Sequence, residues 1–307
     1  MDVVTGAFGY IGRYIARRLL ESGREVRTVT THPDKPNPFG AAVQAFPFDF
    51  NDPARLTGHL EGAETLFNTY WIRFPYGGQT FASAVRNTRT LFECAKKAGV
   101  KRVVHIGVTN ASVNSGLPYY RGKAQQEEAL IASSLPHSIV RPTLVFGKED
   151  ILVNNIAWCL RTFPLFPIFG AGCYRVQPVF VEDLAAIAVE QASASGNVTI
   201  DAIGPDSFTF EEMVRLMAKE MGRKPRFVHL PPSAGLLAGR VISLAKRDVL
   251  LTKDELAGLM EEYLTSPQAP NGRTRFGDWL RANSRTVGRR YTSELARHFR
   301  WTPRASG

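Results

Sequence analysis

Tyr119 and Lys123 are the pair of residues in this chain whose types and spacing best suit proton transfer. In a helix, this spacing puts the phenol and the ammonium one turn apart on the same face. A phenol has a pKa of about 10, so it exchanges protons efficiently at neutral pH only when that pKa falls. A cation within about 4–6 Å lowers it. The pair therefore predicts general acid–base chemistry, although two ordinary surface residues would show the same spacing.

A second group of residues, at the start of the chain, has the spacing of a phosphate-binding turn. Its glycines recur at every third position, directly after the apolar pair Val3-Val4. Glycine permits positive φ and a close approach of backbone N–H groups to a pyrophosphate, and the following helix N-terminus attracts the anion. Tight packing of strand on helix alone would also favour such glycines. The expected cofactor ligands from this turn are Gly6, Phe8, Gly9, Tyr10, Ile11, Gly12 and Arg13.

The elements that must position these residues alternate between strands and helices as far as Gly147. After Val3-Val4, strands are expected at 25–30, 43–48, 65–68, 102–106 and 138–140. Helices are expected at 10–22 and 80–98, closed by Gly23 and Gly99, and a third starts near Tyr119. This alternation predicts a Rossmann-like α/β fold with a doubly wound parallel sheet. After Gly147 helices dominate, at 151–161, 210–221, 233–245 and 253–263.

The glycine turn and the Tyr-x-x-x-Lys pair, in this order, together resemble the short-chain dehydrogenase/reductase superfamily. The length and the C-terminal half resemble its extended, epimerase/dehydratase-like branch. The runs at 5–12, 70–74, 119–124 and 177–185 look like one atypical subgroup, which resembles the nucleotide-binding accessory subunit of respiratory complex I. That accessory subunit is regarded as structural. The resemblance is therefore specific for nucleotide binding and less so for chemistry.

The resemblance also assigns roles and domains. Tyr119 would be the general acid/base, while Lys123 would lower its pKa and bind the nicotinamide ribose. In family members the segment matching 177–185 returns the chain to the nucleotide domain, and Asp183 is expected to cap its helix. We therefore expect an NAD(P)-binding domain at 1–147 with 178–200 returning to it. Residues 148–177 and 201–307 would form a smaller, mostly helical substrate domain.

Further cofactor contacts are expected after the third and sixth strands. Asp49 matches an aspartate that hydrogen-bonds the adenine amino group, although it also suits a turn at the end of a strand. The segment 141–147 resembles one that borders the nicotinamide, which assigns Pro142, Thr143 and Val145 to the cofactor site.

The substrate-binding serine of the family is missing. Gly107 and Val108 occupy its expected positions, and Thr109 or Asn110 is the available substitute.

The end of the second strand decides between NAD and NADP. An acidic residue there binds the ribose hydroxyls of NAD, and a basic one pairs with the 2′-phosphate of NADP. The strand ends in Thr30-Thr31 without an acid, and Arg13 lies just after the glycine motif. We therefore expect NADP, with NAD also compatible.

The composition of the chain indicates which cellular location and which binding partners to expect. Three widely spaced cysteines form no metal-ligand cluster with the six histidines, so we expect a reducing, cytoplasmic location and no metal site. The run 163–169 is short and interrupted by prolines, so it is interpreted as a loop rather than a membrane span. Residues 266–307 hold nine arginines against two acids. This basic C-terminus suits either a solvated edge or a peripheral anionic membrane or acidic protein, and no nucleic-acid motif accompanies it.

Two functions remain open. The tyrosine–lysine pair favours an NAD(P)-dependent oxidoreductase or epimerase-like enzyme with a small-molecule substrate. The missing serine and the basic C-terminus favour a non-catalytic nucleotide-binding protein of a larger complex, and a homo-oligomer is compatible with both. The expected pocket wall mixes aromatic and basic side chains, which suits an amphipathic or anionic substrate or, equally, a domain interface. Its members are Trp71, Arg73, Phe74, Trp158, Tyr174, Arg175 and Gln177.

Overall fold

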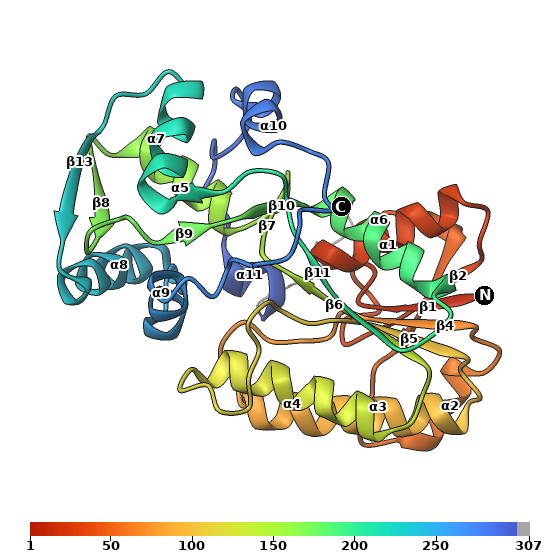
Figure 1. Ribbon diagram of the computed structural model, residues 1–307. Coiled ribbons are helices and arrows are strands. Elements are labelled where there is room, and N and C mark those ends of the chain that lie inside the picture. The colour runs from red at the N-terminus through yellow and green to blue at the C-terminus, as the bar shows by residue number, and fades with distance from the viewer. Residues whose placement is uncertain (300–307) are drawn as a thin grey trace, which may run out of the picture. The chain divides into compact units, whose positions relative to one another are not determined.

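The first strand is buried along its whole length and lies inside a seven-stranded parallel sheet (Figure 1). The computed structural model describes residues 1–299. All strand pairs in this sheet are parallel, in the order β11-β6-β5-β4-β1-β2-β3. This architecture confirms the predicted fold class. The strands are β1 (Asp2–Thr5), β2 (Val26–Thr30), β3 (Val43–Pro47), β4 (Thr65–Asn68), β5 (Arg102–Ile106), β6 (His137–Pro142) and β11 (Val198–Ala202).

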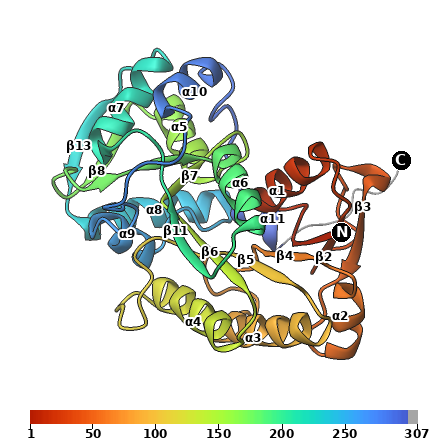
Figure 2. The ribbon, with the colours of Figure 1, turned by 45° about the vertical axis from the view of Figure 1, so that its right-hand side comes forward.

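Helices cover both faces of this sheet, which explains why its central strands are apolar and buried rather than alternating (Figures 1 and 2). α1 packs against α6 on one face, while α2, α3 and α4 lie side by side on the other. Beneath α2 and α3 lies a core that includes Leu66, Leu91 and Phe92. The helices are α1 (Tyr10–Glu21), α2 (Pro53–Leu60), α3 (Phe81–Lys97), α4 (Pro118–Ala132) and α6 (Val181–Glu190), with short 3-10 turns η1 (Gly40–Ala42) and η2 (Gln191–Ser193).

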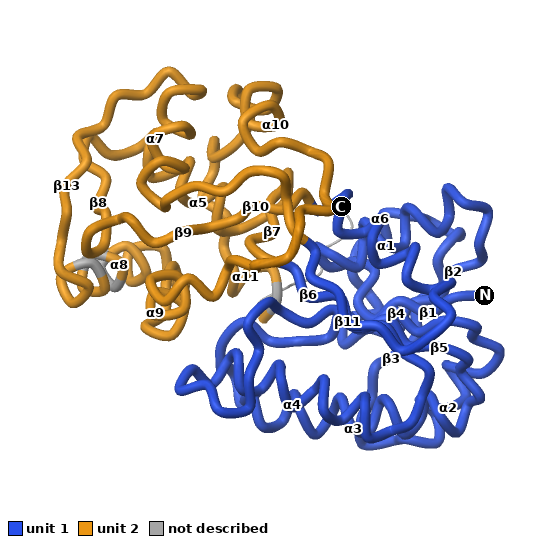
Figure 3. The backbone as a smooth tube through the Cα atoms, in the orientation of Figure 1, with its two compact units in different colours: residues 1–142, 181–202, 303–307 blue, residues 143–180, 203–302 orange. Residues whose placement is uncertain are grey.

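The chain divides into two compact units (Figure 3). Among the described residues, unit 1 comprises 1–142 and 181–202, and unit 2 comprises 143–180 and 203–299. The chain leaves unit 1 after β6, returns to it through α6 and β11, and then leaves again. The first boundary therefore lies at 142, five residues before the one expected at 147.

Unit 2 combines helices with three two-stranded sheets, which pair β10 with β7, β12 with β9 and β13 with β8. Its core is aromatic, and Phe146 contacts both Phe276 and Trp279 edge-on. The strands are β7 (Leu144–Phe146), β8 (Leu165–Phe169), β9 (Arg175–Val176), β10 (Pro178–Phe180), β12 (Phe208–Thr209) and β13 (Arg226–Leu230). The helices are α5 (Leu152–Thr162), α7 (Phe210–Glu220), α8 (Pro232–Lys246), α9 (Lys253–Met260), α10 (Phe276–Asn283) and α11 (Glu294–His298).

Two local predictions were wrong. The run 163–169 is not a loop, because Leu165–Phe169 forms β8 and pairs in parallel with β13. Asp183 does not cap its helix: α6 begins at Val181, which places Asp183 in the first turn. Among the described residues, no helix is long and apolar enough to cross a membrane.

Candidate functional site

The glycine turn joins β1 to α1 at the carboxyl edge of the sheet. Gly6 has φ +64°, and its carbonyl accepts a hydrogen bond from the Gly9 amide at 2.8 Å. A side chain at Gly12 would collide with the Gly6 carbonyl, so glycine at this position lets α1 start directly against the turn. The Ala7 amide donates to Thr28 Oγ1 at 3.0 Å, which ties the turn to β2.

The start of α1 suits an anionic group. Gly9 is the N-cap, and no side chain caps the helix. The first turn also carries no acidic residue, so its amides and the positive end of the helix dipole face no competing negative charge. Tyr10 and Ile11, in this first turn, are half-buried, whereas Phe8 is buried. The turn thus fits the pyrophosphate of a dinucleotide by its backbone alone.

The ends of β2 and β3 hold the residues expected at the adenosine. Thr30 is buried and Thr31 is exposed. Arg13 lies one turn into α1 and donates to the Phe8 carbonyl at 3.4 Å. The Asp49 carboxylate accepts the Asn51 amide at 2.9 Å, which is the turn-forming role that the sequence also allowed. The adenine contact of Asp49 stays a prediction.

Tyr119 and Lys123 lie in the first two turns of α4, within an aromatic group. The Tyr119 ring contacts Trp71 and Phe81 edge-on, with centroids 5.9 Å and 6.1 Å away. Trp71 stacks on Phe81, and the Lys123 ammonium lies 5.2 Å from the centroid of the Trp71 ring. Trp71 comes this close because Gly122 has no side chain: a Cβ there would lie 2.6 Å from the indole. The structure thus brings the predicted pair together with Trp71.

The ammonium of Lys123 is buried at the end of β5. It donates to the Ile106 carbonyl at 2.8 Å. Burial lowers the pKa of Lys123 from 10.5 to about 7, against the opposing attraction of Glu127. The amine can therefore hold or release a proton near neutral pH.

The buried Glu127 forms an ion pair with the half-buried Arg141, which the sequence did not predict. Arg141 Nε lies 3.1 Å from each carboxylate oxygen of Glu127, and Nη2 lies 2.5 Å from Oε2. Burial raises the pKa of Glu127, while its bonds to Arg141 oppose that rise. A Cβ at Gly107 would lie 2.5 Å from Glu127 Oε1. The carboxylate therefore fills the space beside Gly107, where the sequence comparison expects a serine.

Thr109, the proposed substitute for that serine, is completely buried. Its amide and its hydroxyl both point to the Pro142 carbonyl, at 3.1 Å and 3.4 Å. The contact joins the ends of β5 and β6, so Thr109 lies at the same carboxyl edge as Lys123. Its contact with a substrate stays a prediction.

A buried polar chain crosses the same edge of the sheet. Thr5 Oγ1 donates to Asn68 Oδ1 at 3.2 Å, and Asn68 Nδ2 contacts His105 Nδ1 at 3.0 Å. Burial, with Lys123 nearby, holds the pKa of His105 well below its usual value, so the ring is neutral. His105 Nε2 has no hydrogen-bond partner within residues 1–299. A histidine in the apolar run 102–106 was the only signal in the sequence for this chain of polar groups.

The remaining predicted residues fall into different places. Arg73, in unit 1, lies over the Phe74 ring at 5.7 Å. In unit 2, Trp158 contacts Phe163 and Tyr291 edge-on. The other residues also belong to unit 2. Arg175 donates to Ser207 at 2.9 Å, Gln177 Oε1 accepts the Ser266 amide at 2.7 Å, and Tyr174 stacks on Phe210. Thr143 directly precedes β7, and Val145 lies within it. Trp158 and Arg175 thus belong to separate contact groups within unit 2.

A parallel sheet whose first strand runs through a glycine turn into an uncapped helix defines a nucleotide-binding Rossmann-like protein. Residues 6–151 match the family described as NAD(P)H-binding. The chain thus carries an NAD(P)-binding domain and is homologous to an accessory subunit of complex I. The proteins to which it is similar include reductases and epimerases.

The chain is similar to several relatives and solved structures. It is 28% identical, over 81% of its length, to the mitochondrial NADH dehydrogenase [ubiquinone] 1 alpha subcomplex subunit 9 of Arabidopsis thaliana, and it spans 64% of that relative. It is 27% identical to the ceramide reductase of Caulobacter vibrioides, over 91% of this chain and 94% of that one. The NADPH-complexed, NADPH-dependent quinone oxidoreductase of Escherichia coli has the same fold, with TM-score 0.74 and 19% identity over 93% of this chain and 99% of that one.

Proposed function

We propose that this chain is an NAD(P)H-dependent oxidoreductase that acts on a small carbonyl or hydroxyl substrate, with Tyr119 as general acid/base. The observation that carries the proposal is the buried ammonium of Lys123, one helical turn from Tyr119. Burying a lysine beside a carbonyl is energetically costly, and binding of a pyrophosphate at the glycine turn does not require it. A cation near a phenol that must lose a proton is useful in catalysis.

Each residue then has a defined task. The glycine turn holds the pyrophosphate, and a bound NADPH supplies the hydride. Tyr119 donates a proton to the substrate oxygen, or accepts one in the reverse direction. Lys123, fixed by the Ile106 carbonyl, stabilises the phenolate that remains. Thr109 orients the substrate oxygen in place of the missing serine.

The proposed substrate is amphipathic. An apolar wall lies beside the Tyr119 hydroxyl, and it consists of Trp71, Phe81 and the Tyr119 ring itself. A relative that matches nearly the whole chain is named a ceramide reductase, so long-chain ketones and aldehydes come first in a substrate screen. Nucleotide sugars and quinones form the second set, since solved structures with this fold include an epimerase and a quinone reductase.

The test follows NADPH oxidation with these carbonyl compounds and then compares two variants. Tyr119→Phe keeps the ring but removes the proton, so turnover should fall by roughly 10²–10⁴ while NADPH affinity stays unchanged. Tyr120→Phe is the matched control: it lies on the same helix but is spaced three from Lys123, and it should retain turnover. Equal turnover in both variants would remove Tyr119 from the mechanism.

The second candidate is a nucleotide-binding protein without catalysis. Glu127 fills the space next to Gly107, and relatives from complex I carry the same kind of domain. Tight NADPH binding without turnover of any compound in the screen would favour this candidate.

A further inference from the structure

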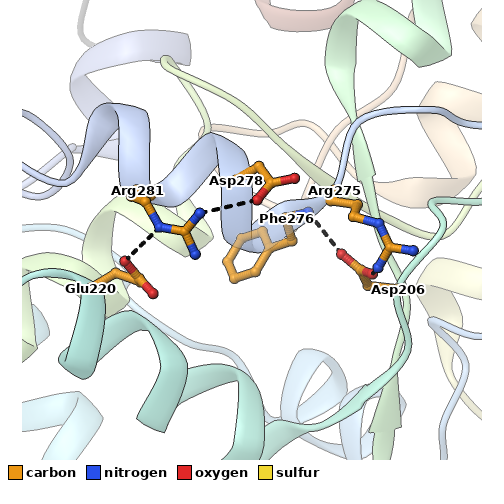
Figure 4. Close-up of polar contacts among 6 residues, drawn as sticks. All are labelled: Asp206, Glu220, Arg275, Phe276, Asp278 and Arg281. Carbon is orange, nitrogen blue, oxygen red and sulfur yellow. Dashed lines mark hydrogen bonds and ion pairs between the residues drawn. The ribbon is translucent and has the colours of Figure 1, made fainter.

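Five exposed arginines of the C-terminal region fall into two groups within unit 2, and the first group is neutralised. Arg275 pairs with Asp206 at 2.8 Å. Arg281 lies between Glu220 and Asp278, at 3.4 Å and 3.3 Å (Figure 4). The contacts with Asp206 and Glu220 hold α10 against the segment before α7 and against the last residue of α7.

The second group follows α10 and is uncompensated. Arg285, Arg289 and Arg290 are exposed, and none of them forms an ion pair with another described residue. Arg289 Nε donates to the Arg285 carbonyl at 2.5 Å, which holds the turn compact. Arg300 and Arg304, which the sequence analysis counted with this region, lie outside the described residues.

Two arginines from other elements join this turn. Arg161, in the last turn of α5, donates to the Val287 carbonyl at 2.9 Å and also to the Ser284 carbonyl. Its pKa is lowered by burial and by the positive charges of Arg223 and Arg289. Arg161 and Arg289 thus donate to neutral carbonyls of this turn rather than to carboxylates, and Arg223 is close enough for its charge to act on Arg161. We call Arg161, Arg223, Arg285, Arg289 and Arg290 the arginine patch.

Apolar side chains are exposed beside the arginine patch. Phe163 and Leu165, just after Arg161, are 38% and 51% exposed. The Arg226 amide donates to the Pro164 carbonyl at 2.9 Å, so the exposed start of β13 lies alongside them and adds a sixth guanidinium. Cationic side chains around exposed apolar ones are the chemistry of an interfacial membrane contact.

We propose that the arginine patch docks unit 2 on an anionic lipid surface, with Phe163 and Leu165 entering the headgroup region. Lipid phosphates would supply negative charge to the arginine patch. The acidic residues in Figure 4 do not provide it, because they are already paired with Arg275 and Arg281. The acyl boundary takes up the apolar side chains. An acidic polypeptide matches the arginines but gives Leu165 no apolar phase to enter. The surface goes beyond the proposed reaction and does not depend on it.

The test is flotation of the full chain with vesicles of phosphatidylcholine alone or mixed equally with phosphatidylglycerol. The protein should bind only the anionic vesicles, and high salt should release it. Arg285→Gln, Arg289→Gln and Arg290→Gln together should weaken binding roughly 100-fold, since each basic residue near the surface contributes about 1 kcal/mol. Leu165→Ser should weaken it several-fold.

The matched control is Arg18→Gln, Arg86→Gln and Arg89→Gln, which removes the same charge from exposed positions on α1 and α3. It should bind nearly as wild type. Equal losses in both triple variants, equal binding to neutral vesicles, or binding to polyglutamate but not to vesicles would each overturn the proposal. Thermal melts confirm folding. If the triple variant does not fold, Arg285→Gln with Arg290→Gln replaces it, because these two side chains form no hydrogen bond or ion pair with residues 1–299.

Discussion

Gly107→Ala tests whether Glu127 has taken the place of the family serine. The added Cβ would lie 2.5 Å from Glu127 Oε1, about 0.9 Å short of ordinary van der Waals contact. Glu127 is buried and held by Arg141 at 3.1 Å, so a shift of that size breaks at least one charge-assisted hydrogen bond. Such a bond contributes about 1.5–3 kcal/mol. We therefore expect the unfolding free energy of unit 1 to fall by about 2–3 kcal/mol.

Hydrogen exchange is the suitable assay because it reports on unit 1 alone, whereas global unfolding mixes two compact units. Protection of the slowest β5 and α4 amides should fall by about 30- to 150-fold. Gly116→Ala is the control, because a Cβ there meets nothing within 4 Å. It should be neutral or slightly stabilising.

A double variant separates the clash from other effects of Gly107→Ala. Glu127→Ala removes the carboxylate and opens the space beside position 107. In that background Gly107→Ala should cost far less, because only the 3.2 Å approach of its Cβ to Arg141 Cγ remains, so the two changes are strongly non-additive. Additive losses, or a Gly107→Ala protein as protected as Gly116→Ala, would refute the account of the missing serine.

Three further predictions concern the cofactor and Lys123. Gly9→Asp should leave α1 intact, since aspartate is a favourable N-cap. Its carboxylate should repel the pyrophosphate, so titration calorimetry in a folded variant should detect no NADPH binding. NADPH should bind at least as tightly as NADH by fluorescence titration, and Arg13→Ala should weaken NADPH selectively; a loss of both alike would remove Arg13 from the 2′-phosphate. Burial lowers the pKa of Lys123 from 10.5 to about 7. Between pH 7 and pH 10.5 the unfolded chain therefore binds more protons than the folded chain. The free energy of unfolding then rises with pH, by up to about 1.4 kcal/mol per pH unit. Lys123→Met should abolish that rise in apo-protein denaturation curves, and an unchanged slope would contradict a depressed pKa.

Much of unit 1 could be predicted because its signals are local. β4 and β5 have the predicted bounds, since short apolar runs fix buried parallel strands. Gly23 and Gly99 close their helices with positive φ. α2 escaped prediction, yet Asp52-Pro53 is the signature of a helix start: Asp52 accepts the Arg55 amide.

The rest depends on contacts that spacing does not encode. Glu127 and Arg141 lie on a helix and a strand, and only the fold brings their charges together. The two-residue strands β9 and β12 exist because they pair with each other. For the candidate site, the glycine turn and the pair Tyr119–Lys123 were predictable from motifs. The contact of the Lys123 ammonium with the Trp71 ring had one signal in the sequence, the glycine at position 122 inside α4.

The return of the chain through Val181–Ala202 has a consequence for synthesis on the ribosome. β6 lies between β5 and β11, and α6 packs on α1. Until residue 202 has emerged, β6 is an open sheet edge and one flank of α1 is bare, and such surfaces promote aggregation. A fragment that stops at residue 147 keeps the open edge of β6 and the bare flank of α1 permanently. Any expression vector for the nucleotide-binding half should therefore encode residues 181–202 as well, joined to 142 by a short linker.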